Sequence, residues 1–210
     1  MRILVLAPRP PWPSIDGGRI AMARLAESLA RAGAEVRMLS LNPRKHRVAV
    51  DAPPLNFRAI DIDTSRVVVP LVGAIAHRRP YIVERFVSKP LAHALREMLR
   101  TFRPDVVQIE SPFLLPYADV VREASDARVM LRSLNVEFRI WETLADAERS
   151  PLRRFALRRV AASLRRYEIA AFNTIDALIP ISHADADDSC EEAAEEPVGS
   201  RLLIHLVRIG

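Results

Sequence analysis

The chain opens with a short, nearly continuous run of apolar residues, Arg2 to Ala7, which proline ends at once. This pattern is typical of a strand that helices cover on both faces, as in a parallel sheet. Apolar residues then recur at helical spacing from Arg19 to Ala32, and Gly33 ends that pattern. A second apolar run, Glu35 to Leu41, follows. The opening therefore predicts a strand, a helix and a parallel strand joined by a right-handed crossover.

Strands and helices keep alternating along the rest of the chain. The pattern predicts further strands over Leu55–Ile62, Asp105–Glu110, Arg128–Ser133, Asp176–Ile181 and Arg201–Ile209. It predicts helices over Pro90–Phe102, Phe113–Ala124 and Glu137–Phe172, the last one broken near Ser150–Pro151. Such alternation indicates a doubly wound, mostly parallel α/β sheet of Rossmann-like type. Because half of the 210 residues are hydrophobic, we expect a single three-layer domain over 1–210 rather than two small ones.

Charge is unevenly distributed along the sequence. The net charge is +5, but the stretch from Asp185 to Glu196 holds seven carboxylates and no basic residue, so the remainder carries +12. A basic body suits phosphate-rich ligands, anionic lipid surfaces or nucleic acid, and the arginine-rich usage of a high-GC genome is the alternative explanation. We expect no nucleic-acid partner, because no series of stacking aromatic residues accompanies the arginines.

Three pairs of arginines, at 153–154, 158–159 and 165–166, punctuate the apolar positions of the long helical stretch. A basic amphipathic helix of this kind either lies on an anionic membrane surface or carries its arginine stems along a solvated face. A second basic patch consists of Arg78, Arg79, Arg85 and Lys89. Both interpretations stay open for both patches.

The single cysteine, Cys190, excludes an internal disulfide and is typical of a reducing compartment. The opening apolar run is too short for the core of a signal peptide. The longest later apolar run, Val67 to Ala76, contains Pro70 and Gly73 and falls far short of the roughly twenty residues of a spanning helix. We therefore expect a cytoplasmic protein whose membrane contact, where it occurs, is peripheral and at the inner membrane face.

Polar residues and glycines gather after the predicted strands, where a doubly wound sheet binds its ligands. The candidates at these strand ends are Asp16, Gly17, Gly18, Arg19, Asn42, Glu110, Ser111, Arg132 to Glu137, Ser182 and His183. Gly17 and Gly18 stand between the first strand and the first helix, where bare backbone N–H groups can approach an anion. A phosphate-binding turn and a plain tight turn are both compatible with this pair.

Other candidates also have a structural interpretation beside the functional one. Glu110 ends an apolar strand and is either a ligand contact or a solvated strand end. Ser182 begins the pattern of a capping box with Asp185. Asn135 is placed to cap the helix that Glu137 opens.

Several familiar site types do not occur in the sequence. The turn after the first strand has neither G-x-G-x-x-G nor G-x-x-x-x-G-K-[ST] spacing, and Asn42 stands where a dinucleotide-binding strand would end in a carboxylate. A dinucleotide-dependent dehydrogenase is therefore disfavoured. The five histidines are scattered and the cysteine has no partner, so we predict no structural metal and no cofactor.

Four segments stand out for their order and spacing. They are Met1 to Pro8 with Pro11 and Asp16 to Arg19; Leu25 to Gly33 with Glu35 and Val36; Asn135 to Glu142; and Ile181 and Ser182 with Ala184 and Asp185. Together they resemble the amino-terminal domain of the family 4 glycosyltransferases, a large retaining group with the GT-B architecture. The resemblance spans most of the chain.

In that family two Rossmann-like domains face each other, the first holding mainly the acceptor and the second most of the nucleotide-sugar donor. The resemblance implies that Gly17 and Gly18 lie against the donor diphosphate, and that no metal ion is needed. The position before the Asn-Val-Glu segment, often histidine in the family, is Leu134 here, so no catalytic residue is assigned. The acceptor or cleft candidates are Asp16, Arg19, Glu110, Ser111, Asn135, Glu137 and Ser182.

We expect the chain to be the acceptor-side half of such an enzyme, building a cell-surface polysaccharide from a nucleotide-sugar and a glycan or lipid-linked acceptor. The donor-binding carboxy-terminal domain is absent from these 210 residues, so the isolated chain is expected to be inactive. The alternative is a truncated, non-catalytic module that binds an acceptor, a partner or a membrane. The two-domain interpretation predicts that the strand ends near Pro10–Trp12, Phe113–Leu115 and Leu134 form a cleft wall with more apolar exposure than a complete monomer tolerates, which a second domain would cover.

Overall fold

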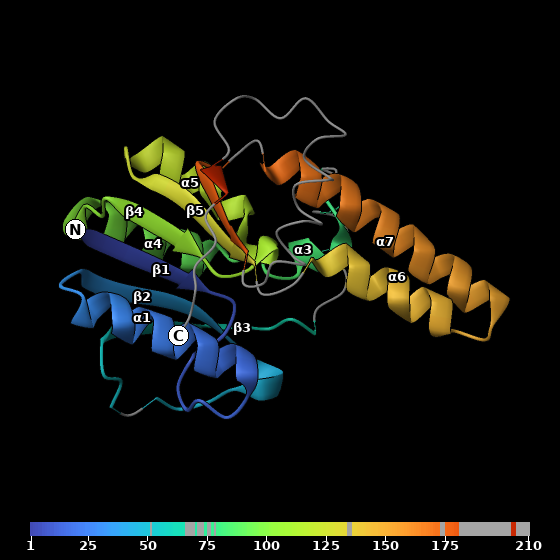
Figure 1. Ribbon diagram of the computed structural model, residues 1–210, viewed down its shortest axis with the longest axis horizontal. Coiled ribbons are helices and arrows are strands. Elements are labelled where there is room, and N and C mark those ends of the chain that lie inside the picture. The colour runs from blue at the N-terminus through green and yellow to red at the C-terminus, as the bar shows by residue number, and fades with distance from the viewer. Residues whose placement is uncertain are drawn as a thin grey trace.

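The structure is a computed structural model, and it describes residues 1–50, 52–65, 70, 74, 77, 79–133, 136–172, 175–180 and 203–204. In this part of the chain the strands are parallel and form one sheet in the order β3-β2-β1-β4-β5-β6-β7 (Figure 1). The strands are β1 (Arg2–Ala7), β2 (Glu35–Pro43), β3 (Asn56–Ile62), β4 (Val106–Ile109), β5 (Arg128–Ser133), β6 (Ala177–Pro180) and β7 (Leu203–Ile204). The α-helices are α1 (Gly17–Arg31), α3 (Tyr81–Glu84), α4 (Lys89–Phe102), α5 (Pro116–Ala124), α6 (Glu137–Ala147) and α7 (Pro151–Phe172). This order confirms the predicted Rossmann-like α/β fold.

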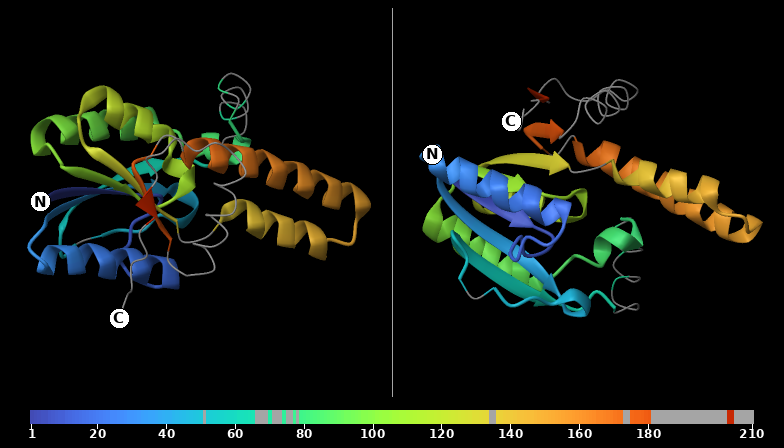
Figure 2. Two further views of the ribbon diagram at one scale, coloured as in Figure 1. Left: turned by 45° about the horizontal axis from the view of Figure 1, so that its top comes forward. Right: turned by 60° about the horizontal axis from the view of Figure 1, so that its bottom comes forward.

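Helices cover both faces of the sheet, which makes three layers (Figure 2). Successive residues of β1 point to opposite faces. Ile3 and Val5 join the apolar cluster that includes α1, whereas Leu4 and Leu6 join the larger cluster that includes α4 and α5. All four side chains are buried. Burial on both faces is the reason why β1 is a continuous apolar run in the sequence rather than an alternating one.

The helix α4 shows how local sequence sets an element and its buried face. The Ser88 hydroxyl accepts a hydrogen bond from the Leu91 N–H at 3.4 Å and so caps the first turn. Arg103 ends the helix in the left-handed region, with φ of 51°. Leu91, Leu95 and Leu99 recur four residues apart and are buried on one face. This spacing is the signal from which the helix was predicted.

Helices α6 and α7 pack together as a hairpin that projects past the carboxyl ends of the strands (Figures 1 and 2). The predicted break at Ser150–Pro151 is confirmed. Proline has no N–H and disfavours helical backbone at the residue before it, so a new helix starts at Pro151. At the base of the hairpin, Phe138 of α6 and Leu164 of α7 are buried in one cluster with Val83 of α3.

Some boundaries differ from the predictions. The helix expected from Phe113 begins at Pro116, because Pro112–Leu114 form a separate 3-10 helix. The helix α3 and the 3-10 helix Arg44–His46 were not predicted, since elements this short show no periodicity. Of the last predicted strand, 201–209, the structure describes only β7, which pairs with β6.

Candidate functional site

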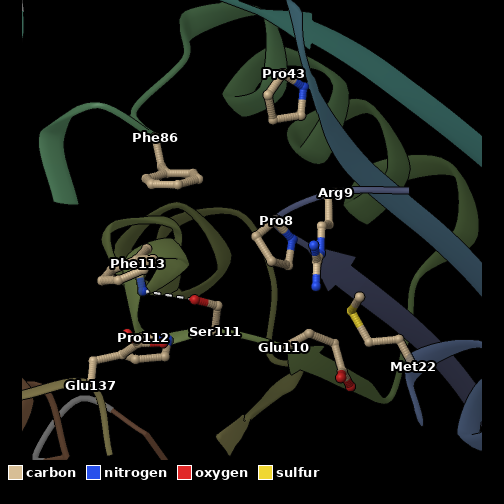
Figure 3. Close-up of a pocket in the computed structure, with 10 residues that line it drawn as sticks. All are labelled: Pro8, Arg9, Met22, Pro43, Phe86, Glu110, Ser111, Pro112, Phe113 and Glu137. Atoms are coloured by element: carbon tan, nitrogen blue, oxygen red, sulfur yellow. Dashed lines mark hydrogen bonds between the residues drawn. The ribbon is translucent and has the colours of Figure 1, made fainter. Parts of the chain in front are cut away.

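A pocket of about 300 Å³ opens beside the carboxyl ends of β1 and β4 (Figure 3). Its lining residues are Pro8, Arg9, Met22, Pro43, Phe86, Glu110, Ser111, Pro112, Phe113 and Glu137. The strands β1 and β4 are neighbours in the sheet, but the chain leaves β1 into α1 on one face and β4 into α5 on the other. In a doubly wound sheet this reversal of strand order is where ligands bind.

Asp16 organises the entrance to α1. Its Oδ1 accepts hydrogen bonds from the Arg19 N–H at 3.0 Å and from Arg9 Nη2 at 2.9 Å. Asp16 is therefore the N-cap of the helix, and Gly17 and Gly18 form its first turn rather than a loop before it. The prediction that this pair precedes the helix is wrong, because the Asp16 carboxylate starts the helix two residues earlier.

The first turn of α1 is open to an anion. The N–H groups of Gly17 and Gly18 belong to a turn that has no acceptor within the helix, and they lie at its positive end. A side chain at Gly17 would meet no atom within 4 Å. Neither glycine has a positive φ, so the backbone conformation does not require them. What distinguishes Gly17 is the open space beside it.

Arg9 is a pocket residue that was not predicted. Its guanidinium is partly exposed, lines the pocket and pairs with Asp16. In the sequence, Arg9 is a basic residue among the prolines that follow the first strand. The hydrophobic periodicity used to predict helices and strands gives no weight to such a residue. Its position next to α1 adds a cation to a helix N-terminus, and both attract phosphate.

Arg19 is placed differently from the prediction. It was expected in the cleft, but the structure buries it to 4% exposure beneath the helix start. Its Nε lies 3.4 Å from Asp16 Oδ2, and neither Nε nor Nη1 has a hydrogen-bond partner among the described residues. Arg19 therefore contributes positive charge to the helix start and does not line the pocket.

Glu110 is buried at the floor of the pocket, with 2% exposure. It accepts hydrogen bonds from Arg132 Nη1 at 2.6 Å and from the Gln108 amide. Burial raises the pKa of Glu110, while Arg132 and Gln108 oppose that shift. The interpretation of Glu110 as a solvated strand end is wrong. Arg132 of the neighbouring strand β5 pairs with the Glu110 carboxylate, and both side chains are buried.

Glu137 is the first residue of α6 and lines the pocket beside Pro112 and Phe113. Burial among these apolar neighbours raises its pKa to about 7. A carboxyl group with this pKa exchanges protons near neutral pH. Ser111 lies next to it, with its Oγ accepting a hydrogen bond from the Phe113 N–H at 3.3 Å.

Residues 16–193 match the model of the glycosyl transferase 4-like domain. The chain belongs to this family. No curated protein matches the sequence.

Solved structures similar to this glycosyl transferase 4-like domain are GT-B glycosyltransferases, and the domain matches about half of each of the following three. Phytolacca americana UGT2, solved with UDP-2fluoro-glucose and pterostilbene, is 9% identical with a TM-score of 0.58, over 100% of this chain and 53% of its own. Sucrose-phosphate synthase from Thermosynechococcus elongatus is 14% identical with a TM-score of 0.60, over 100% and 48%. The lipopolysaccharide outer core galactosyltransferase WaaB is 10% identical with a TM-score of 0.51, over 97% and 44%. The domain spans about half the length of these chains and has the fold of their amino-terminal half.

The predicted apolar wall of the glycosyl transferase 4-like domain is largely buried. Pro10, Pro11, Leu114 and Leu115 lie inside, while Trp12 and Phe113 are half-buried. Trp12 packs edge-on against Phe57, and Phe113 stacks on Phe86 with ring centroids 5.2 Å apart. Part of the predicted wall therefore belongs to the core, because these rings pack against other aromatic rings of the same domain.

The predicted positions Leu134, Asn135 and Ser182 lie outside the described residues. The residue that precedes α6 is Val136, which makes no side-chain cap bond. Among the described residues, no three His, Cys, Asp or Glu side chains are grouped to hold a metal ion. None of the described helices has the length and hydrophobicity needed to cross a bilayer.

Proposed function

We propose that this domain is the acceptor-side half of a retaining glycosyltransferase, which transfers a sugar from a nucleotide-sugar to a glycan or lipid-linked acceptor of a cell-surface polysaccharide. The observation that carries the proposal is the pocket at the reversal point of the sheet, lined from α1 and from the start of α6. Family membership supports the reaction class. The coverage of about half of the similar enzymes supports a separate donor-binding half, so the isolated chain catalyses no transfer.

The donor diphosphate is assigned to the N-terminus of α1. During transfer, an acceptor hydroxyl oxygen bonds to the anomeric carbon and the bond from that carbon to the diphosphate breaks. Negative charge grows on the leaving oxygen, and the diphosphate takes up the proton that the hydroxyl loses. The N–H groups of Gly17 and Gly18 and the Arg9 guanidinium are placed to stabilise that charge. This requires no metal ion and no cofactor.

The acceptor is assigned to the pocket itself. The stacked rings of Phe86 and Phe113 offer an apolar face, and Ser111 and Glu137 offer polar groups beside it. A wall of this mixed kind suits a sugar ring, which has both apolar and hydroxyl-bearing sides. Glu110 is occupied by Arg132 and is assigned a structural role.

The test is a titration of the 210-residue chain with nucleotide-sugars. Binding is monitored by the nuclear magnetic resonance signals of the backbone amides. UDP-glucose and GDP-mannose are expected to shift the amide signals of Gly17 and Gly18 with a dissociation constant on the order of millimolar, because one side of the donor site is worth only about 4 kcal/mol. Arg9→Ala is expected to weaken this binding several-fold, since it removes a charge-assisted phosphate contact. Arg24→Ala, at an exposed position further along α1, is the matched control and leaves it unchanged.

Two results would contradict the assignment. Micromolar affinity measured by calorimetry would show that the chain holds a complete donor site. Amide shifts confined to residues away from the start of α1 would show that the diphosphate does not bind there.

A further inference from the structure

The outer end of the α6–α7 hairpin carries large apolar side chains that nothing covers. We define the hairpin tip as residues 148–159. Every residue from Pro151 to Ala156 is exposed, with Leu152 at 78% and Phe155 at 62%. These two lie three positions apart on α7 and so share one helix face. In a domain with a well-packed core, such a face marks a contact surface.

The tip is also strongly basic. It holds one carboxylate, Glu148, and the five arginines Arg149, Arg153, Arg154, Arg158 and Arg159, for a net charge of +4. Arg158 lies 3.3 Å from Asp146, but both side chains are more than 60% exposed, so the attraction is weak in water. Arg159 lies 5.7 Å from the ring centre of Phe155. Exposed apolar side chains and cations thus share one small surface.

The arrangement favours one kind of partner. The tip lies at the outer end of a projecting helix hairpin, where it can reach a membrane surface before the rest of the domain does (Figures 1 and 2). Leucine and phenylalanine ringed by arginine is the composition of helices that sit at the boundary between lipid headgroups and acyl chains. Anionic headgroups would neutralise the +4 charge while the two apolar side chains leave water.

We propose that the hairpin tip docks on a lipid bilayer with anionic headgroups. Leu152 and Phe155 enter the acyl boundary, and the arginines around them contact phosphates. The interaction requires no transferase activity, so it stands or falls independently of the proposed function. It would hold the pocket, which opens at the base of the same hairpin, at a set distance of about 20 Å from the membrane, given 1.5 Å per helical residue.

The test is flotation of the 210-residue chain with phosphatidylcholine vesicles, with and without roughly a third of phosphatidylglycerol. The chain is expected to float with the anionic vesicles, less so at high salt, and not with the neutral ones. Arg153→Glu with Arg154→Glu is expected to weaken binding at least about tenfold, because each arginine near an anionic surface is worth about fivefold. Leu152→Ser with Phe155→Ser is expected to weaken it by at least about tenfold, through lost apolar burial.

The matched control is Arg24→Glu with Arg100→Glu, which makes the same change of charge at exposed positions on α1 and α4. This variant is expected to keep most of the binding. Equal flotation with neutral vesicles, or equal losses in the control and tip variants, would overturn the proposal. Concentration-dependent self-association in the ultracentrifuge that Leu152→Ser with Phe155→Ser abolishes would also overturn it, by identifying a second copy as the partner.

Discussion

Two carboxylates at the same edge of the sheet have different surroundings. Glu110 is fully buried and has Arg132 as its counterion, whereas Glu137 is partly buried among apolar side chains. Burial raises the pKa of both groups, but only Glu110 has a cation that opposes the shift. Glu110 is therefore suited to stabilising the fold, and Glu137 is suited to exchanging protons.

Glu137 makes stability depend on pH. Its pKa is about 7 in the folded chain and near 4.5 when exposed, so between these values the folded state holds a proton that the unfolded state has lost. The free energy of unfolding therefore falls as pH rises from about 4.5 to 7. Glu137→Gln is expected to remove this decline and to be more stable than the original chain at pH 8, by about 1 kcal/mol after partial exposure and the loss of charge at the helix start are allowed for.

The measurement is urea unfolding at several pH values between 4.5 and 8. Glu142→Gln, at a partly exposed position on the same helix, is the control and is expected to keep the decline. Identical pH curves for Glu137→Gln and the original chain would show that Glu137 is not desolvated.

Removing one member of the buried ion pair tests its role. Arg132→Met leaves the Glu110 charge without a counterion at 2% exposure, which is expected to cost about 3–5 kcal/mol at neutral pH. Arg58→Met removes an exposed partner of Glu97 and is expected to cost less than about 1 kcal/mol. Equal losses in equilibrium unfolding would contradict the difference. Glu110→Gln combined with Arg132→Met is expected to recover much of the stability, because no charge then stays buried.

At the scale of elements, the α6–α7 hairpin has a packed base and a bare tip. Phe138 at the base is 1% exposed against Val83 and Leu164, whereas Phe155 at the tip is 62% exposed. Phe138→Ala is expected to lower the free energy of unfolding by about 3–5 kcal/mol, since it opens a cavity. Phe155→Ala is expected to change it by less than about 0.5 kcal/mol. Similar losses for the two variants would show that the tip packs against the domain.

The junction between α6 and α7 is set locally. Pro151 cannot donate a backbone hydrogen bond and restricts Ser150, so one helix ends and another begins. The angle at which the hairpin leaves the sheet is set by the cluster of Val83, Phe138 and Leu164, whose members come from three helices. The break between the two helices could be predicted from the sequence, but the angle at which the hairpin projects from the sheet could not.

At the scale of the whole molecule, the pocket and the hairpin lie on the same side of the sheet (Figures 1 and 3). Parallel strands bring their carboxyl ends to one edge, so the segments that follow β1 and β4 meet there. The start of α1 supplies positive charge, and the start of α6 supplies Glu137. The start of α1, the pocket and the basic α6–α7 hairpin therefore all lie at this edge.

The sheet class, most helix positions and the family could be predicted from the amino-acid sequence. These depend on periodicity, on proline and glycine, and on the order of motifs, all of which act over a few neighbouring residues. It also predicted that Glu110 and Ser111 follow a strand and that Glu137 opens a helix, whereas Gly17 and Gly18 form the first turn of α1 instead of a loop before it.

The contacts that these side chains make could not be predicted from the sequence. Glu110 finds Arg132 twenty-two positions away, Phe86 stacks on Phe113, and Arg9 turns to Asp16. The same pattern of arginines and apolar residues fits a solvated helix or a membrane surface, and exposure of Leu152 and Phe155 is what favours the second. Burial and charge pairing join distant segments, so they appear only once the chain has packed.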